Sequence, residues 1–354
     1  CGVPLHTHDS YVARLVRAGH AVAIAEQVED PAAARRRPGK ALVERAIVRI
    51  LTPGTLTEER LLDGRRDNHL LAAFPAGDRI GLCWADISTG SFAIATVAAT
   101  ALGDELARIG PAEILWPDDA PPPAAGPVRR LAADRFDSRT GERLLLVRHA
   151  VATLDGFGRF ERPGLAAAAA LLGHIADTQR GAPVRLDPPR AHQPGTTMAI
   201  DAATRRSLEL TEGSSGGRHG SLLFAIDRTV TAPGARLLAA ELGSPLTSVA
   251  AIEERLDLVQ WLLDERVRRP LRAALRSPPD LARLCGRIVA GRGTPRDLAQ
   301  LRDGFGTAAA IGTLLADAAA AGAPAALSDI RAGLVPPPGL AAALSERLAE
   351  TPPA

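Results

Sequence analysis

The sequence predicts a multidomain chain in which two α/β parts precede an all-α part. Three observations support this fold class. Apolar, β-branched runs of strand length alternate with helical segments over the first 190 residues, a Pro-rich stretch covers residues 183–194, and only helical periodicity follows Met198. A chain of 354 residues is long enough for about two or three domains, and 46% hydrophobic with 23% charged residues is an ordinary globular composition.

The charge of the chain gives no global reason to expect a polyanionic partner. The formal net charge is +2, from 42 basic and 40 acidic residues. Lys40 is the single lysine, and the chain is also rich in Ala, Gly and Pro, so the many arginines are explained by compositional bias. A local basic surface for nucleic acid remains open.

The three cysteines, Cys1, Cys83 and Cys285, are far apart and form no CxxC or Cys/His pair with metal spacing. They indicate reduced, buried thiols in a cytoplasmic protein. No apolar run approaches the ~20 residues of a membrane span, so no membrane partner is expected.

The first part of the chain, to about Leu51, is expected to be a small α/β layer. Asp9 or Ser10 can cap a helix that runs through Ala18, with Tyr11, Leu15 and Val16 on its apolar face, and Gly19 suits the position just after the helix. Two strand-like runs follow, AVAIAEQV (21–28) and VERAIVRIL (43–51), separated by a polar loop that contains Arg35, Arg36 and Arg37.

The second part is predicted to contain a hairpin, two helices and a buried strand. Residues 80–87 and 92–97 are expected to be strands joined by Ser88-Thr89-Gly90. The other expected elements are a helix at 101–110, a strand at 112–117, a loop at 117–127 and a helix at about 165–178. The linker at 183–194 ends this part.

The third part is expected to be helical throughout. Thr294-Pro295-Arg296-Asp297 is a strong helix start, with a hydroxyl cap, a proline in the first turn and a carboxylate three residues after the cap. Ile252, Leu256, Val259 and Leu263 recur at helical spacing, so we expect this apolar face to be buried.

Asp86, in the run Asp86-Ile87-Ser88-Thr89-Gly90, permits two enzyme hypotheses. The run resembles the phosphate-binding hairpin of actin-like ATPases, and an Asp on a first strand resembles a ribonuclease-H-type metal site. No second acidic residue can be placed beside it from the sequence. We therefore favour the interpretation that the tripeptide makes a turn and that Asp86 caps or braces it.

No other pattern predicts catalysis, a cofactor or a metal. GxxxxGK[ST] is absent, and His6 and His8 beside a proline are better explained as turn residues than as ligands. Gly213 to Gly220 is expected to be a loop between helices. Arg205, Arg206, Arg218, Arg228 and Arg236 could form a basic stripe for phosphate, although a solvated helix face is the favoured interpretation.

Five segments in the same order resemble the MutS family of bacterial DNA mismatch-recognition proteins. They are residues 1–31, VERAIVRILTPGT (43–55), ADISTGSF (85–92), DAATRRSLELTE (201–212) and DRTVTAPGARLL (227–238). The resemblance implies that residues 1–58 are the later part of the mismatch-binding domain, 65–190 a connector domain with a ribonuclease-H-like fold, and 196–354 the start of the helical core and lever domain.

The resemblance also implies the function and the partners. Such a protein binds duplex DNA with mispairs or small loops and forms a homodimer. It also recruits a MutL-type protein, and the full-length parent uses ATP and Mg²⁺. The chain begins without Met at a point inside the family's first domain, so a fragment lacking both ends, the ATPase included, is expected; the Phe-x-Glu wedge would precede it. The implied DNA contacts are Gln27, Arg45, Pro4, His6 and Ser10. The alternatives are an enzyme centred on Asp86 and a helical protein-interaction scaffold.

Overall fold

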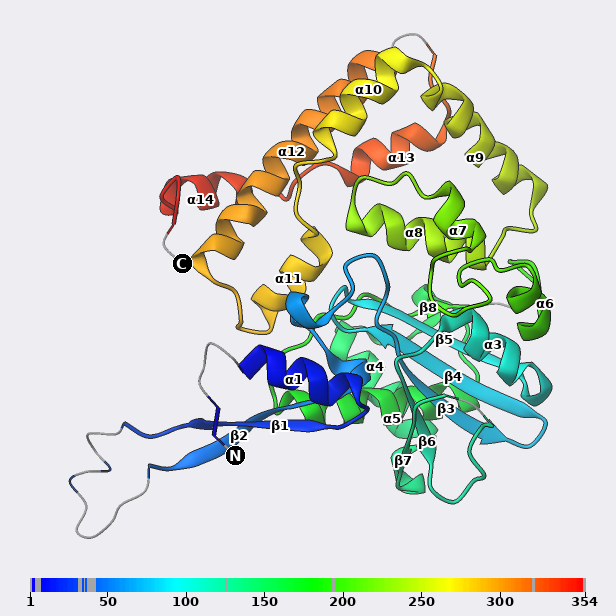
Figure 1. Ribbon diagram of the computed structural model, residues 1–354, viewed down its shortest axis with the longest axis vertical. Coiled ribbons are helices and arrows are strands. Elements are labelled where there is room, and N and C mark those ends of the chain that lie inside the picture. The colour runs from blue at the N-terminus through cyan, green and yellow to red at the C-terminus, as the bar shows by residue number, and fades with distance from the viewer. Residues whose placement is uncertain are drawn as a thin grey trace. The chain divides into compact units, whose positions relative to one another are not determined.

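Figure 1 shows the computed structural model, which describes residues 2–3, 8–30, 34, 36, 43–124, 126–192, 195–319 and 322–352. The chain forms two compact units. The first comprises residues 1–63 and 68–192, and the second comprises residues 64–67 and 193–354. The short stretch 64–67 therefore belongs to the second unit, although the chain on both sides of it belongs to the first.

The first unit begins with a two-stranded antiparallel ribbon over which one helix lies (Figure 1). These elements are α1 (His8–Arg17), β1 (Val22–Gln27) and β2 (Arg45–Leu51). The predicted helix ending is confirmed at Gly19, which has φ 83°. The Gly19 N–H donates to Val16 O at 2.9 Å and the His20 N–H to Leu15 O at 3.0 Å, the Schellman arrangement that a glycine favours.

Two predicted details of α1 are wrong. The helix begins at His8, so Asp9 and Ser10 lie in its first turn and neither precedes it as a cap. Its buried side chains are Val12 and Val16, whereas Tyr11 is 47% exposed. Leu15 is 45% exposed. The core of this part, which includes Leu51 and Leu56, lies against the face that carries the two valines.

The rest of the first unit is built on a six-stranded sheet with the order β7-β6-β3-β4-β5-β8. The strands are β3 (Leu70–Ala76), β4 (Arg79–Asp86), β5 (Ser91–Ala98), β6 (Glu113–Pro117), β7 (Val128–Leu131) and β8 (Arg190–Ala191). β3, β4 and β5 are antiparallel neighbours, which confirms the predicted hairpin, while β6, β7 and β8 each pair in parallel.

Helices cover both faces of this sheet. They are α3 (Leu102–Ile109), α4 (Ser138–His149) and α5 (Arg162–Gln179). α4 and α5 share one core with one face, and α3 completes a second core on the other. α5 is the predicted alanine-rich helix, and it packs very closely: an added Cβ at Gly81 would lie 1.9 Å from the Pro163 carbonyl oxygen, and one at Gly141 1.9 Å from that of Leu165.

Several elements of the first unit were not predicted. β3 is an apolar run that contains Pro75, and β7 carries Arg129 and Arg130 at one end of the sheet order, so neither has a clear strand pattern. α4 begins after Asp137, whose carboxylate accepts from Thr140 N at 2.7 Å as a helix cap. The short strand β8 lies inside the stretch predicted to be a linker.

The second unit is helical, as predicted. Its helices are α6 (Ala202–Ser207), α7 (Leu222–Ile226), α8 (Ala232–Gly243), α9 (Val249–Leu262), α10 (Glu265–Ala274), α11 (Leu281–Val289), α12 (Pro295–Ala319), α13 (Ala326–Gly333) and α14 (Leu340–Arg347). α10 runs beside the long helix α12, which also contacts α11 and α14 (Figure 1).

The start of α12 confirms the prediction in detail. Thr294 Oγ1 accepts from Asp297 N at 3.2 Å, and Asp297 Oδ2 accepts from Thr294 N at 2.8 Å. Each residue therefore satisfies a backbone N–H of the other, as in a capping box. Arg287 adds an ion pair to Asp297 at 2.8 Å.

The prediction for α9 was wrong. Leu256, Val259 and Leu263 are 58%, 55% and 57% exposed, and Ile252 is 37% exposed. The helical spacing was real, but no described element packs over this face. α9 thus leaves an apolar stripe on the surface of the helical unit.

Candidate nucleic-acid interface

The ribbon brings two of the predicted DNA-contact residues together. Gln27 at the end of β1 and Arg45 at the start of β2 are direct Cα partners in the antiparallel register. Opposed residues in such a pair project from the same face, and both side chains are exposed. The amide can donate and accept hydrogen bonds at base edges, and the guanidinium suits phosphate.

This face of the ribbon is the one that does not carry α1. Val22 and Ile24 pack in the core that includes the α1 valines. Side chains alternate along a strand, so Gln27 lies on the opposite face of β1 from them. The register shifts between Ile24 and Ala25, a bulge that increases the local twist of the ribbon before the pair of Gln27 and Arg45.

The other predicted contacts do not join this pair. Ser10 is exposed on α1 and lies nearly opposite Val12 and Val16 around the helix, so it faces away from the ribbon. Pro4 and His6 lie outside the described residues, as do Arg35 and Arg37 of the polar loop. Arg36 is an exposed turn residue.

The charge around the pair is mixed. Arg45 makes no ion pair with any described residue. Two exposed acids lie next to the pair in sequence, Glu44 before Arg45 and Glu26 before Gln27. Arg49 further along β2 is neutralised by Glu58, with only 14% of the Arg49 side chain exposed. The ribbon can therefore neutralise few phosphates, which limits its non-specific affinity for DNA.

A buried carboxylate fixes the far end of β2 to the sheet. β2 leads through Thr52 into the short 3₁₀ turn η2 (Pro53–Thr55). Glu113 on β6, only 2% exposed, accepts hydrogen bonds from Thr52 Oγ1 and, at 3.0 Å, from Gly54 N. Its other oxygen accepts from Arg129 Nε. Because bonds to an ionised acceptor are stronger than neutral ones, this residue ties the ribbon to the rest of the first unit.

His174 of α5 lies next to this carboxylate. Its Nε2 atom is buried, has no hydrogen-bond partner among the described residues, and is 4.0 Å from Glu113 Oε1. Burial lowers the pKa of His174 below 6.5, and the negative charge of Glu113 opposes this shift only in part. The imidazole is therefore neutral in the folded protein at neutral pH.

Asp86 braces its hairpin, as we expected. Its Oδ1 accepts from Ser88 N at 2.8 Å and from Ser88 Oγ at 2.6 Å, and its Oδ2 accepts from Asn68 N at 2.9 Å. The residue is fully buried. Both oxygens are thus engaged by the turn and by the start of the neighbouring strand, an arrangement that favours neither enzyme hypothesis.

The predicted arginine stripe of the helical part is not a solvated helix face at three of its five positions. Arg218 and Arg228 lie in loops, and Arg236 is buried on α8. Arg236 is 6% exposed and pairs with Asp67 and Asp280. Arg218 pairs with Asp227, whose side chain is 4% exposed. The Arg236 guanidinium is buried and that of Arg218 is half-buried, and each pairs with a carboxylate at the end of a helix, a pairing that linear spacing does not reveal.

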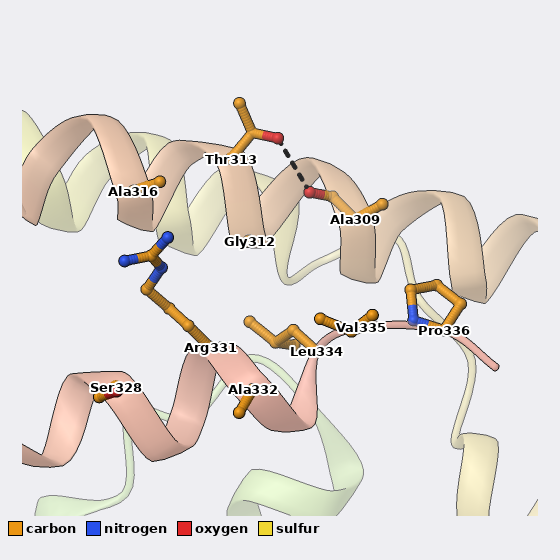
Figure 2. Close-up of a pocket in the computed structure, with 10 residues that line it drawn as sticks. All are labelled: Ala309, Gly312, Thr313, Ala316, Ser328, Arg331, Ala332, Leu334, Val335 and Pro336. Carbon is orange, nitrogen blue, oxygen red and sulfur yellow. Dashed lines mark hydrogen bonds between the residues drawn. The ribbon is translucent and has the colours of Figure 1, made fainter. Parts of the chain in front are cut away.

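A hollow of about 630 Å³ lies between α12 and α13 in the helical unit. Figure 2 shows Arg331 reaching across it from α13 toward α12, where Thr313 Oγ1 donates to the Ala309 carbonyl oxygen at 3.2 Å. Arg331 is the one charged residue that lines the hollow, and none of the predicted DNA-contact residues lines it.

In the described part of the chain, no three His, Cys, Asp or Glu residues gather as around a metal ion, and no helix has the length and apolarity to cross a membrane.

Three family models match the chain in collinear order. They are MutS domain I over residues 1–60, MutS domain II over 68–188 and MutS domain III over 203–354. The chain belongs to the MutS family. The resemblance found in the sequence is thereby confirmed, together with its coarse fold class of mixed α/β parts followed by helices.

Known relatives agree with this assignment. The DNA mismatch repair protein MutS of Cereibacter sphaeroides is 48% identical over 324 residues, covering 90% of this chain and 37% of the relative. That of Rhodopseudomonas palustris is 50% identical over 319 residues, covering 86% and 35%, and that of Nitrobacter hamburgensis is 48% identical over 319 residues, with the same coverage. The chain thus spans little more than a third of the length of these MutS relatives.

Sequence reasoning missed Glu113, Asp227 and Arg236 as organising residues. Glu113 had a usable signal, because it is a single acid at the start of an otherwise apolar strand. Such a residue must find a partner if it is buried. Arg236 and the pairing of Asp227 with Arg65 had no comparable signal, since these partners lie more than 40 residues apart in the sequence.

Proposed function

We propose that this chain is part of a MutS protein that binds duplex DNA with mispairs or small loops and initiates ATP-dependent mismatch repair. The collinear matches to MutS domains I, II and III carry this proposal. In it, residues 1–58 belong to the mismatch-binding domain, 65–190 to the connector, and 196–354 to the helical core and levers. A mispair costs less to unstack and bend than a paired step, which supplies the energy for discrimination.

The connector in this proposal has a ribonuclease-H-like fold without catalytic activity. A mixed sheet with helices on both faces supports the fold label. The engagement of one Asp86 oxygen by Ser88 of the turn and of the other by the Asn68 N–H supports a structural role for that residue. The whole protein would be cytoplasmic and would act as a homodimer with a MutL-type partner, using ATP and Mg²⁺ bound elsewhere in its chain.

The ribbon is proposed to contribute backbone contacts to DNA. The exposed guanidinium of Arg45 would bind a phosphate, and the amide of Gln27 on the same face would bind the backbone or a base edge. Phosphate contacts position a protein on DNA without reading the sequence. We therefore assign to this pair a positioning role rather than mispair discrimination.

The test is a fluorescence-anisotropy titration of a homoduplex and a G·T heteroduplex with the 354-residue chain at two salt concentrations. Arg45→Ala should weaken binding to both duplexes alike and reduce the log–log salt slope by about 0.9, the value for one phosphate contact. Arg14→Ala is the matched control, since it removes an exposed arginine from α1 and should have little effect. A large effect of Arg45→Ala on the heteroduplex alone would contradict the positioning role, and a complete lack of DNA binding would count against the proposed function.

A further inference from the structure

The four residues Gly64–Asp67, here called the strap, are held by the helical unit through buried charges. The chain enters the strap from Asp63 and leaves it at Asn68, and both of these residues belong to the first unit. Asn68 is itself fixed there, because its N–H donates to Asp86 at 2.9 Å and its side-chain amide to Pro53 O at 2.9 Å. The strap thus interrupts the first unit with a short piece of the second.

Asp227 holds the strap on one side. Its carboxylate accepts from Arg65 Nη2 at 2.6 Å, and the same nitrogen lies 2.7 Å from Thr229 Oγ1. Arg218 also donates to Asp227, and Thr229 donates to it through its N–H at 2.8 Å and its hydroxyl at 2.6 Å. A carboxylate so fully satisfied and so well buried fixes the direction of the Arg65 side chain.

Two buried arginines hold the backbone of the strap. Arg236 Nη1 donates to the Gly64 carbonyl oxygen at 2.7 Å, and its guanidinium pairs with Asp280 at 2.7 Å and with Asp67 at 3.4 Å. Arg283 Nη2 donates to the Arg66 carbonyl oxygen at 2.7 Å. The two guanidinium groups are only 7% and 3% exposed.

This arrangement is stronger than an ordinary loop contact. Loop carbonyl groups are usually hydrated, whereas these two accept from ionised donors that the surrounding helices keep away from water. Removing Arg236 would leave the Asp280 carboxylate, 14% exposed, without its nearest cation. The strap therefore cannot separate from the helical unit without exposing the buried guanidinium and carboxylate groups that bind it.

We propose that Arg236, Arg283 and Asp227 are positioning residues that make the strap a fixed anchor of the helical unit. The backbone that joins the ribbon part of the first unit to its sheet part is then held by side chains of the helical unit. Movement of the strap away from the helical unit must break these hydrogen bonds and ion pairs. The inference does not depend on DNA binding, so its failure is separate from that of the proposed function.

Limited trypsin digestion of the 354-residue chain, followed by mass spectrometry, tests the anchor. Trypsin can cleave the strap after Arg65 or after Arg66. The Arg66 carbonyl group, which the protease would attack, accepts a hydrogen bond from Arg283. Proteolysis of a closed segment follows the population of its open form, so Arg236→Met should speed cleavage at these two sites at least about tenfold. Arg255→Met is the matched control, because it removes an exposed pair with Glu241 in the same unit and should leave the cleavage rate unchanged.

Cleavage after Arg287, within α11, reports whether the helical unit itself unfolds. Should Arg236→Met raise that cleavage equally, the double variant Arg236→Met/Asp280→Asn decides, because it removes the unpaired carboxylate and keeps a side chain that can cap α11. Selective cleavage at the strap in the folded variant supports the anchor. Cleavage of the strap at the wild-type rate in a folded variant, or rapid cleavage there in the wild-type chain, overturns it.

Discussion

His174 Nε2 lies 4.0 Å from the carboxylate of Glu113, and both side chains are almost completely buried. Glu113 is already satisfied by Thr52, Gly54 and Arg129, so the imidazole adds a neutral neighbour to a compensated anion. The groups that face His174 act in both directions. Burial, Arg129 and Arg135 disfavour its protonation, while Glu113 and Asp177 favour it, and burial is the largest effect on its pKa.

We expect His174 to make the protein less stable in mild acid. Its pKa is lower in the folded chain than in the unfolded one, so the unfolded chain binds more protons between the two values and stability rises with pH across that window. The free energy of unfolding, measured by urea denaturation, should fall as the pH drops below the ordinary histidine value of 6.5, and less so in His174→Phe. Thr178→Ala, one turn away on α5 and not titratable, should keep the wild-type slope. Equal slopes in all three proteins would contradict the assignment.

Glu113→Ala should destabilise the first unit by about 3 kcal/mol, because it leaves the Thr52 hydroxyl and the Gly54 N–H without their buried acceptor and Arg129 without its anion. Thermal unfolding measured by circular dichroism gives this value. The control is Glu161→Ala, which removes an exposed ion pair with Arg79 and should cost no more than about 0.5 kcal/mol. Similar losses in the two variants would show that Glu113 does not tie the ribbon to the sheet.

Asp297→Asn should weaken the start of α12 by about 1 kcal/mol near neutral pH. Burial raises the pKa of Asp297, but hydrogen bonds from Arg287 and Thr294 outweigh burial and lower the pKa overall. A carboxylate with a lowered folded pKa contributes stability above its unfolded pKa and loses it as the pH falls through the folded value. The difference from wild type should therefore vanish in strong acid. Asp303→Asn, an exposed acid on the same helix, is the control.

Magnesium or calcium should leave the melting temperature of the chain unchanged, because both oxygens of Asp86 already accept hydrogen bonds, one from Ser88 in its own turn and one from the Asn68 N–H. Phosphate release from ATP should likewise not depend on this residue. Differential scanning fluorimetry with and without metal, and an ATPase assay of wild type and Asp86→Asn, provide the measurements. A rise of several degrees with metal that disappears in Asp86→Asn would revive the enzyme hypotheses.

Local signals predicted the parts of the fold that depend on neighbouring residues. Gly19 ends α1, Thr294 and Asp297 begin α12, and the turn at Ser88 joins β4 to β5, because each feature is decided within about four residues. The strands and helices without such signals were missed. β7 is recognisable only through its parallel pairing with β6, which the sequence does not display.

The candidate site was predictable only in part, for the same reason. The pairing of Gln27 with Arg45 follows once the two strands and their register are known. The register depends on a bulge, however, and no residue type in the sequence indicates that bulge. The apolar spacing on α9 correctly indicated an amphipathic helix and wrongly indicated burial, since spacing says nothing about what covers a face. The partners of Arg236 come from two distant segments, the strap and the start of α11, and no window of sequence contains them both.

The helical unit is discontinuous in sequence, and this affects how the protein can be divided. A chain that starts at residue 196 lacks the strap, so Arg236 loses the Gly64 carbonyl group and Asp67, and Asp227 loses Arg65. A helical domain that is cut at the family boundary and expressed separately would carry this defect. Supplying residues 64–67 through a short added loop, rather than lengthening either end, is the change that should restore the autonomous stability of the helices.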